Sequence, residues 1–282
     1  MSKKLELIRE KKLHKLLPNS KKKKLEASGV YVADESTCYV VFDNFNKVGR
    51  VDLKLKSSKS NKLIHLLNVG TGFEDITYDP LSDRFYLIVE ALEDKSHGGF
   101  RGLVSEYDGD FMFHRCSQLE PAFKKKNKGF EGVEHIRRGD AEYLVGLWED
   151  TLGQDGNKGR GRLYLFPKAS DGSWAKPRAI NLPASAKFKD FAAIARRGNR
   201  VAVVSQKSKR LWLGEINETF SGFVKGTGTT YRFPKKCYGN VEGVSWLCDD
   251  RLVMVSDKKK KKQKKCCADK DQSIHIFRIP NG

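Results

Sequence analysis

The chain has 282 residues, of which 39% are hydrophobic, and its 54 lysines and arginines against 35 acidic residues give a net charge of +19. It contains no run of about 18 apolar residues, so a transmembrane helix is not expected, and its first residues lack the apolar centre of a secretory signal. We therefore expect a cytoplasmic, monomeric protein whose hydrophobic fraction is sufficient for a folded core.

Residues 3–17 form the first predicted element and contain the sequence LELIREKKLHKLL. The leucines at positions 5, 13, 16 and 17 suit one face of an amphipathic helix, and the same segment also suits an additional strand. The choice between helix and strand depends on the repeats that follow.

From residue 27 onward a short strand-like phrase recurs five times, roughly every 45 to 60 residues, which is the spacing of propeller blades. The phrases are ASGVY, FEDIT, FEGVE, KDFAA and VEGVS, at 27–31, 73–77, 130–134, 189–193 and 241–245. Their alignment places one oxygen-bearing side chain per repeat at an equivalent position: Ser28, Glu74, Glu131, Asp190 and Glu242.

Four strand patterns follow one another in the complete repeats, as in FEDITYD, RFYLIVEA, GLVSEYDGD and FMFHRCSQL of the second. The fifth repeat has only three, so pairing the 3–17 strand onto it would close the ring and cover an exposed edge. The sequence therefore predicts an all-β protein, a five-bladed β-propeller of four-stranded blades, as one domain over residues 1–282 with a lysine-rich loop at 258–272.

The second strand of each repeat ends in a polar residue: Asp43, Glu90, Glu149, Gln206 and Asp257. In a propeller the innermost strand begins at the same face at which the second strand ends. We therefore expect both polar sets to converge at one mouth of the central channel.

Several carboxylates near one axis raise one another's pKa unless positive charge lies among them. A hard cation is one source of that charge, and Ca²⁺ accepts six to eight oxygen ligands in flexible geometry. We expect Ser28, Glu74, Glu131, Asp190 and Glu242 to hold it. The alternative is a water-filled channel whose acids bind backbone amides or are neutralised by lysines of the rim.

The five-fold ring resembles that of the calcium-activated nucleotidases, propellers in which serine and glutamate side chains surround a central Ca²⁺. A closer resemblance is to the phytase-like (esterase-like activity of phytase) propeller superfamily, whose blades begin with a phrase such as LEGITYDP. The segments GFEDITYDPLSDRFYLIVEA, GFEGVEHIRRGDAEYLVGLWED and NVEGVSWLCDDRLVMVSD carry it. The resemblance covers nearly all of the chain from residue 27 and implies a propeller with a polar funnel.

Basic residues are predicted at the same mouth, among them Lys128, Lys189 and Lys207, and with Asp43 and Gln206 they are candidate ligand-binding residues. An acidic metal centre with a basic rim suits a small phosphorylated molecule. We expect hydrolysis of a phosphoester or phosphoanhydride, with Glu90, Glu149 or Asp257 as general base. The alternative is a noncatalytic ligand-binding or interaction propeller, in which these acids only bond backbone amides at strand ends.

Lysine runs at 21–24, 124–126 and 258–265 supply much of the net charge. They indicate solvated loops, nonspecific contact with polyanions, or, for KKKKKQKK, a nuclear localisation signal. The runs lack interleaved aromatic residues that would stack on bases.

Six cysteines show no regular framework, so we expect reduced thiols, with Cys266 and Cys267 an exposed pair in the lysine-rich loop. His135 follows Glu134 on an inner strand. It either lines the channel below the ring or is a buried histidine with its polar partners satisfied.

Overall fold

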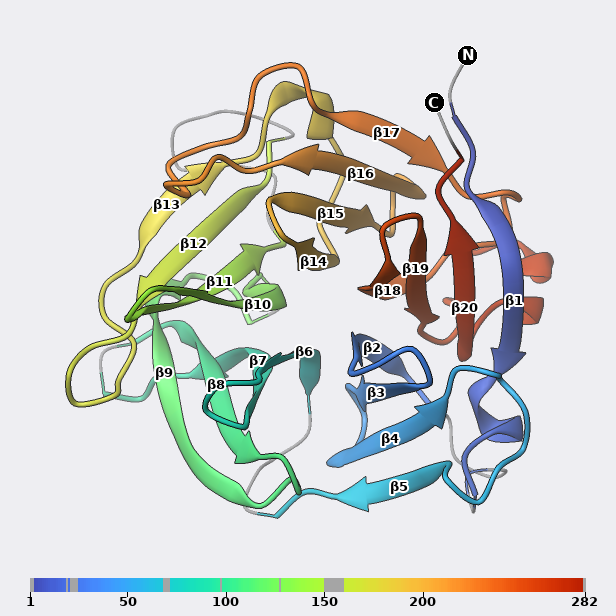
Figure 1. The fold of residues 1–282 in the computed structure, drawn as a ribbon, viewed down its shortest axis with the longest axis horizontal. Helices are drawn as coiled ribbons and strands as arrows, with labels where there is room; N and C mark the ends of the chain where they lie inside the picture. The colour runs from blue at the N-terminus through green and yellow to red at the C-terminus, as the bar shows by residue number, and fades with distance from the viewer. Residues whose placement is uncertain are drawn as a thin grey trace.

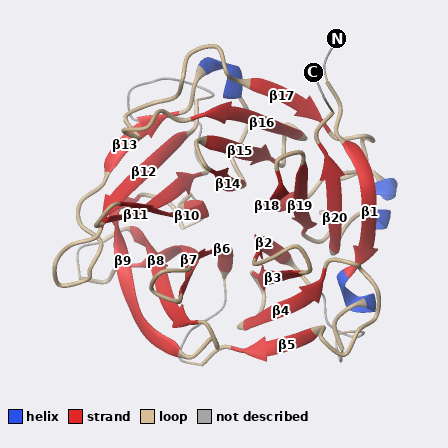
Figure 2. Cartoon of the chain, viewed as in Figure 1, coloured by secondary structure: helices blue, strands red, loops and turns tan. Residues whose placement is uncertain are grey.

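The computed structural model describes residues 3–18, 20, 25–67, 72–96, 98–126, 128–149 and 160–280. Its strands form five four-stranded antiparallel sheets around a central axis (Figure 1), with only short helical turns between them (Figure 2). The predicted five-bladed propeller is confirmed.

The blades follow one another along the chain, and each runs from an inner to an outer strand. Blade 1 contains β2 (Ala27–Val32), β3 (Thr37–Phe42), β4 (Lys47–Asp52) and β5 (Lys62–His65). Blade 2 contains β6 (Phe73–Asp79), β7 (Arg84–Glu93), β8 (Phe100–Asp108) and β9 (Phe113–Phe123). Blade 3 contains β10 (Phe130–Arg138), β11 (Ala141–Trp148), β12 (Arg162–Pro167) and β13 (Arg178–Asn181).

Blades 4 and 5 complete the ring. Blade 4 contains β14 (Ala193–Arg197), β15 (Arg200–Ser205), β16 (Arg210–Glu215) and β17 (Thr229–Arg232). Blade 5 contains β18 (Val241–Cys248), β19 (Arg251–Ser256), β20 (Ser273–Arg278) and β1 (Glu6–Lys12). The 3₁₀ helices are η1 (Leu13–Lys15), η2 (Ala184–Ala186) and η3 (Lys265–Asp269).

The hydrophobic core is divided among the junctions between neighbouring blades. Between blades 2 and 3, for example, Tyr86 and Ile88 of β7 pack in one cluster with Phe130 and Val133 of β10. Because strand side chains alternate between the two faces of a sheet, each blade supplies apolar residues to both of its neighbours.

The first strand of the chain closes the last blade. β1 pairs antiparallel with β20, from Glu6 opposite Arg278 to Lys12 opposite Ser273. The predicted strand is confirmed and the helical alternative is wrong, although the strand covers residues 6–12 rather than 3–17. The remainder turns through η1, because Leu13, Leu16 and Leu17 are needed in the core beside blade 1.

A polar cluster fixes β1 to the rest of blade 5. Glu10 of β1 accepts hydrogen bonds from the Tyr238 hydroxyl at 3.1 Å and from Lys270, and its carboxylate lies 3.2 Å from Nδ1 of His275. The hydrogen bond with His275 is the main cause that lowers the pKa of Glu10 to about 2, against the effect of burial. The closing strand is thus held by a charged group as well as by its backbone ladder.

Inner strands approach one another closely at the axis. A Cβ atom on Gly29 would lie 2.5 Å from Cα of Asp75 in blade 2, and one on Gly243 would lie 2.9 Å from the carbonyl oxygen of Ser28 in blade 1. Only glycine fits at these two positions, which explains the small residue that follows the repeated acid or serine.

Side chains also bond the inner strands across the junctions. The Ser28 hydroxyl donates to the Phe73 carbonyl at 2.5 Å, and the backbone N–H of Val133 donates to Asp75 at 3.0 Å. The same role is taken at the remaining junctions by the pairs Arg196 N–H to Glu134 (2.8 Å), Trp246 Nε1–H to Ala195 carbonyl (3.4 Å) and Val32 N–H to Ser245 (3.0 Å). All five junctions therefore carry a hydrogen bond between a side chain and a neighbouring backbone.

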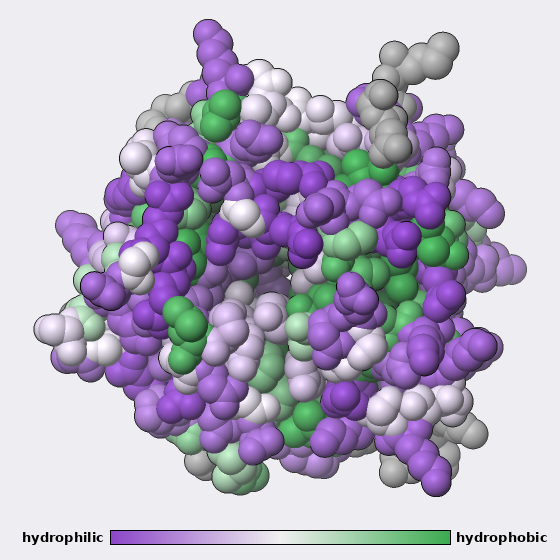
Figure 3. All heavy atoms as spheres, in the orientation of Figure 1, coloured by the Kyte–Doolittle hydropathy of each residue, from purple (hydrophilic) through white to green (hydrophobic). Residues whose placement is uncertain are grey.

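Hydrophilic side chains cover most of the face seen in Figure 3, around a central hollow. Within the described part of the chain, no helix has the length and apolar character needed to cross a membrane.

Replacing Glu10 by glutamine should lower the free energy of unfolding by about 1–2 kcal/mol, because the change removes the charged acceptor at the ring closure. The folded-state pKa lies below the ordinary value of 4.5, so this contribution is present above pH 4.5 and is lost as the pH falls through about 2. Chemical denaturation at neutral and acidic pH measures both effects.

Glu6→Gln is the matched control, since Glu6 lies on the same strand with a side chain 56% exposed and only a 3.8 Å contact to Arg278. Equal losses in the two variants would contradict a specific role for Glu10.

Candidate metal centre at the channel mouth

A cavity of about 820 Å³ opens at one mouth of the central channel, and we call it the funnel. Eight carboxylates and four lysines line it: Glu26, Asp43, Glu74, Glu90, Glu131, Glu149, Glu242, Asp257 and Lys258 to Lys261. The predicted convergence of the two polar sets is confirmed for seven residues: Asp43, Glu74, Glu90, Glu131, Glu149, Glu242 and Asp257.

Bulges at the start of the inner strands present the ring residues. The pairing register shifts between Phe73 and Asp75, between Phe130 and Gly132, and between Val241 and Gly243. The skipped residues are Glu74, Glu131 and Glu242. An unpaired bulge residue can turn away from the regular alternation of the strand, which directs these three acids into the funnel.

Ser28 and Asp190, the other two predicted metal ligands, do not line the funnel. Ser28 also occupies a bulge, but its buried hydroxyl is bonded to the Phe73 carbonyl. Asp190 precedes β14, which begins at Ala193, later than the sequence predicted. Its buried carboxylate accepts hydrogen bonds from the Ser205 hydroxyl at 2.5 Å and from the Lys207 N–H at 3.0 Å.

The tightest cluster of acids in the funnel joins both predicted sets. Carboxylate oxygens of Glu90, Glu131 and Glu149 all lie within 4.8 Å of one another. Lys128 bonds Glu149 at 2.5 Å, and the Lys207 ammonium lies 3.5 Å from the same carboxylate. Lys128, before β10 of blade 3, and Lys207, after β15 of blade 4, thus both place positive charge beside Glu149.

Burial, together with mutual repulsion, raises the pKa of several funnel acids. Glu74 and Glu131 are raised well above the ordinary value, with Glu90 the next cause for Glu74 and Glu74 the next cause for Glu131. The pKa of Glu242 rises to about 8, that of Glu90 to about 7 and that of Asp257 to about 6. The funnel therefore has a deficit of positive charge at neutral pH.

Lys260 partly compensates for this deficit. Its ammonium donates to Oε1 of Gln206 at 3.2 Å and lies 3.4 Å from Oε1 of Glu242. Burial lowers the pKa of Lys260, but attraction to Glu242 and Asp257 outweighs it and the net shift is upward. Nothing in the sequence distinguishes Lys260 from the rest of its lysine run; the one available signal is that this loop follows Asp257 at the funnel face.

The other predicted ligand-binding residues divide between the funnel and its surroundings. Asp43 is an exposed member of the lining, and Gln206 reaches the funnel by donating to Glu242. Lys189 lies instead in a neighbouring cavity, where its backbone N–H donates to Ser208 at 2.8 Å.

The donor chemistry of the funnel fits a hard cation. Among the described residues its lining offers carboxylate oxygens and no histidine or cysteine, which excludes a site built for a soft metal. Glu90, Glu131 and Glu149 are close enough to share one ion, and Glu74 and Glu242 extend the oxygen set.

The cysteine prediction is wrong for one pair. Cys237 and Cys266 form a disulfide with a Cα–Cα distance of 5.3 Å, because the loops before β18 and before β20 meet beside the funnel. Cys267 is buried rather than exposed. The disulfide ties the lysine-rich loop, and with it the segment that carries Lys260, to the body of blade 5.

His135 does not line the channel. It is buried between blades 2 and 3, stacks on Tyr86 and lies 3.2 Å from Glu142. Arg137 and Lys168 also bind Glu142, at 3.1 and 2.7 Å. Arg137 and Lys168 balance the carboxylate charge of Asp79 and Glu142, so this cluster with His135 serves as a contact between blades.

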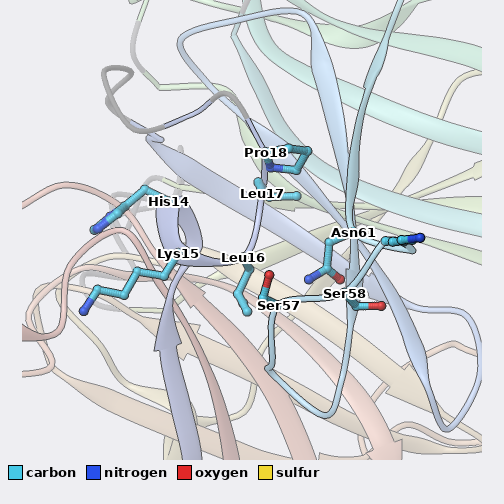
Figure 4. Close-up of a pocket in the computed structure, with 9 residues that line it drawn as sticks. His14, Lys15, Leu16, Leu17, Pro18, Ser57, Ser58 and Asn61 are labelled. Atoms are coloured by element: carbon cyan, nitrogen blue, oxygen red, sulfur yellow. The ribbon is translucent and has the colours of Figure 1, made fainter.

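Another large cavity, of about 780 Å³, lies between the segments 14–18 and 57–61 (Figure 4). Its described lining contains His14, Lys15 and Ser58 but no carboxylate. It holds none of the predicted site residues.

No family model matches the sequence, and no curated protein matches it. Among solved structures, the chain is similar to glutaminyl cyclase of Myxococcus xanthus, with a TM-score of 0.57 and 12% identity over 100% of both chains. It is also similar to the PQQ-bound aldose sugar dehydrogenase of Streptomyces coelicolor, with a TM-score of 0.54 and 15% identity over 96% of this chain and 98% of that one. A luciferin-regenerating enzyme gives a TM-score of 0.50 and 14% identity over 90% and 78%.

At these identities the likeness establishes the propeller fold and leaves activity open. The resemblance to the phytase-like superfamily and to the calcium-activated nucleotidases stays a prediction.

Lys260→Met should destabilise the cation-free protein by about 0.5–1 kcal/mol, because it removes a partly exposed countercharge from Glu242. The same change should tighten binding of a divalent cation about fivefold, equivalent to about 1 kcal/mol. Thermal melting and calorimetric titration measure the two effects. Lys262→Met, in the same loop but outside the described lining, is the control; matching shifts in both variants would contradict the role of Lys260.

The cation-free protein should lose stability as the pH rises from about 5 to 8, because folded Glu90 and Glu242 retain protons that the unfolded chain has already released. Stability falls with rising pH because the folded-state pKa values of Glu90 and Glu242 lie above the ordinary value of 4.5. The charges that act on Glu242 are Asp257, Lys260 and Asp43, and those that act on Glu90 are Glu149, Lys128 and Asp43.

Glu131→Gln removes one repelling carboxylate, so its melting temperature should exceed that of the wild type most at pH 8. The difference between variant and wild type cancels titrations elsewhere, including that of His275. A difference that stays constant between pH 5 and 8 would contradict the charge deficit.

Proposed function

We propose that this protein binds a divalent cation in the funnel, Ca²⁺ fitting best, and hydrolyses a phosphoester or phosphoanhydride of a small molecule there. The observation that carries the proposal is the convergence of Glu90, Glu131 and Glu149 within 4.8 Å. Carboxylates held this close and partly buried gain most from a shared cation.

Glu90, Glu131 and Glu149 would hold the ion, with Glu74 and Glu242 supplying further oxygens. This assignment moves Glu90 and Glu149 from the general-base role to the ligand set. When bound, a divalent cation neutralises phosphoryl oxygens and makes a bound water more acidic.

Asp257 is then the candidate general base, since it lines the same cavity outside the three-carboxylate cluster. A base must reach the proton that it accepts, and Asp257 opens into the same cavity as the proposed ion ligands. Lys207 is suited to binding the remaining phosphate charge, because its side chain is 54% exposed at the rim.

Addition of Ca²⁺ to the chelator-treated protein should raise the melting temperature, since a ligand that binds only the folded state stabilises it by mass action. At one hundred times the dissociation constant the gain is about 2.7 kcal/mol. Glu131→Gln should lose at least half of this gain. Glu93→Gln, at an exposed position at the end of β7, should keep it.

Phosphate release from nucleotides, sugar phosphates and inositol phosphates tests the catalytic part. Asp257→Asn should keep the calcium-induced stabilisation and lose about 100-fold in turnover, the usual contribution of a general base. Stabilisation by Ca²⁺ without phosphate release from any of these substrates would favour a noncatalytic cation-binding propeller. An unchanged melting temperature with both Ca²⁺ and Mg²⁺ would refute the metal centre.

A further inference from the structure

Three cations lie side by side on the outer part of blade 4. Arg210 of β16 stands directly opposite Arg232 of β17 in the antiparallel ladder, and Arg232 is bridged on its other side by Lys4. Like charges directly opposite one another on neighbouring strands repel. The repulsion within this row of cations disfavours the folded state, and a bound anion would reduce that repulsion.

Two cavities flank this row and share Arg210. The first, of about 410 Å³, is lined by the cations Lys187, Lys189, Lys207 and Arg210. The second, of about 310 Å³, is lined by Lys4, Lys209, Arg210, Arg232, Lys235 and Lys236. We call these nine residues the blade 4 basic track.

The track lacks local countercharge. Among the described residues, no aspartate or glutamate lines either cavity. Counting only ion pairs between described residues, Lys207 alone among the members has an acidic partner within 4.0 Å, and its partners are Glu149 and Asp190 on the funnel side. The track therefore begins at the funnel rim and continues outward across blade 4 as uncompensated positive charge.

Backbone contacts hold part of the track in position. The Arg210 guanidinium donates to the carbonyl oxygens of Ser208 and Lys209, at 3.3 and 3.1 Å, and the Lys209 ammonium donates to the Lys236 carbonyl at 3.2 Å. Burial and then repulsion from Arg232 lower the pKa of Arg210. These contacts restrict the rotamers of Arg210 and Lys209, which reduces the entropy lost on binding.

The shape of the track favours an elongated polyanion over a single phosphate group. Two cavities joined through one arginine present charge along a path rather than around one point. Phe188 and Phe233 in the linings are buried, at 6% and 5% exposure, so neither offers a ring for stacking on a base or for insertion into a membrane. Contact would be made through the repeated phosphates of a backbone.

We propose that the blade 4 basic track binds the phosphate backbone of a nucleic acid without reading its sequence. Apart from Lys207, which lies at the boundary of the two, this surface is separate from the cation site in the funnel, and the inference does not rest on the proposed hydrolase activity. It also differs from nonspecific attraction by the whole basic protein, because it assigns the contact to one blade.

The test compares binding of labelled single-stranded DNA, single-stranded RNA and duplex DNA to the full chain at several salt concentrations. The track variant carries Arg210→Gln, Arg232→Gln and Lys236→Gln. The matched control carries Lys124→Gln, Lys125→Gln and Lys126→Gln, three exposed lysines between β9 and β10 that lower the net charge by the same amount.

The track variant should bind at least tenfold more weakly at about 0.1 M salt, and its slope of log affinity against log salt should be shallower by about two for single strands. The control should change affinity less than threefold, and oligonucleotides of different sequence should bind wild type alike. The melting temperature of the track variant should equal or exceed that of the wild type, because repulsion between Arg210 and Arg232 is removed. This readout separates lost binding from lost folding.

Equal weakening in both triple variants would assign binding to net charge and overturn the proposal, as would unchanged binding in the track variant. Track-dependent binding to vesicles of phosphatidylserine and phosphatidylcholine, with none to nucleic acid, would overturn it in favour of a membrane surface. If Ca²⁺ does not stabilise the wild-type protein but the track still binds nucleic acid, only the proposed function of the funnel is contradicted.

Discussion

The fold depends on how the inner strands satisfy their backbone groups at the channel. Each inner strand is the edge of its own sheet, and an edge exposes N–H and C=O groups that need partners. At every junction a side chain of one blade bonds a backbone group on the inner strand of its neighbour. The Asp75 carboxylate, for example, accepts the Val133 N–H, and the Glu134 carboxylate accepts the Arg196 N–H. The same few residues that close the ring therefore also decide which acids remain free to face the funnel.

Adjacent residues of one bulge illustrate this division. Glu74 lines the funnel, whereas Asp75 turns into the junction and accepts the Val133 N–H. Two of the funnel acids accept a backbone N–H, Glu90 from Gly129 and Asp257 from Lys258, and lysines that reach in from loops place positive charge beside Glu149 and Glu242. The protein thus separates a ring of hydrogen-bonded polar groups from a charged mouth whose balance depends on lysine side chains from loops and, in our proposal, on a cation.

Much of the fold was predictable because each blade repeats one local pattern. The strand phrases of blades 2 and 3, the missing strand of blade 5 and its closure by the first segment all follow from apolar periodicity and turn residues. The fate of individual acids was not predictable in the same way. Asp190 resembles Glu131 in sequence, but β14 begins after it without a bulge, and its carboxylate is taken up by Ser205 and Lys207. Lys260 and the Cys237–Cys266 disulfide depend on two long loops meeting at the rim, which sequence spacing does not reveal.

The position of β1 in blade 5 has a consequence for the order in which the chain folds during synthesis. Among the described strands of the propeller, the ribosome makes β1 first, yet its ladder partner, β20, is made last. The backbone groups of β1 and the acceptor Glu10 must wait without their partners in β20 while blades 1 to 4 are completed. The lysines and glutamates that interrupt this strand then serve a second purpose, because they keep a waiting edge soluble until the ring closes.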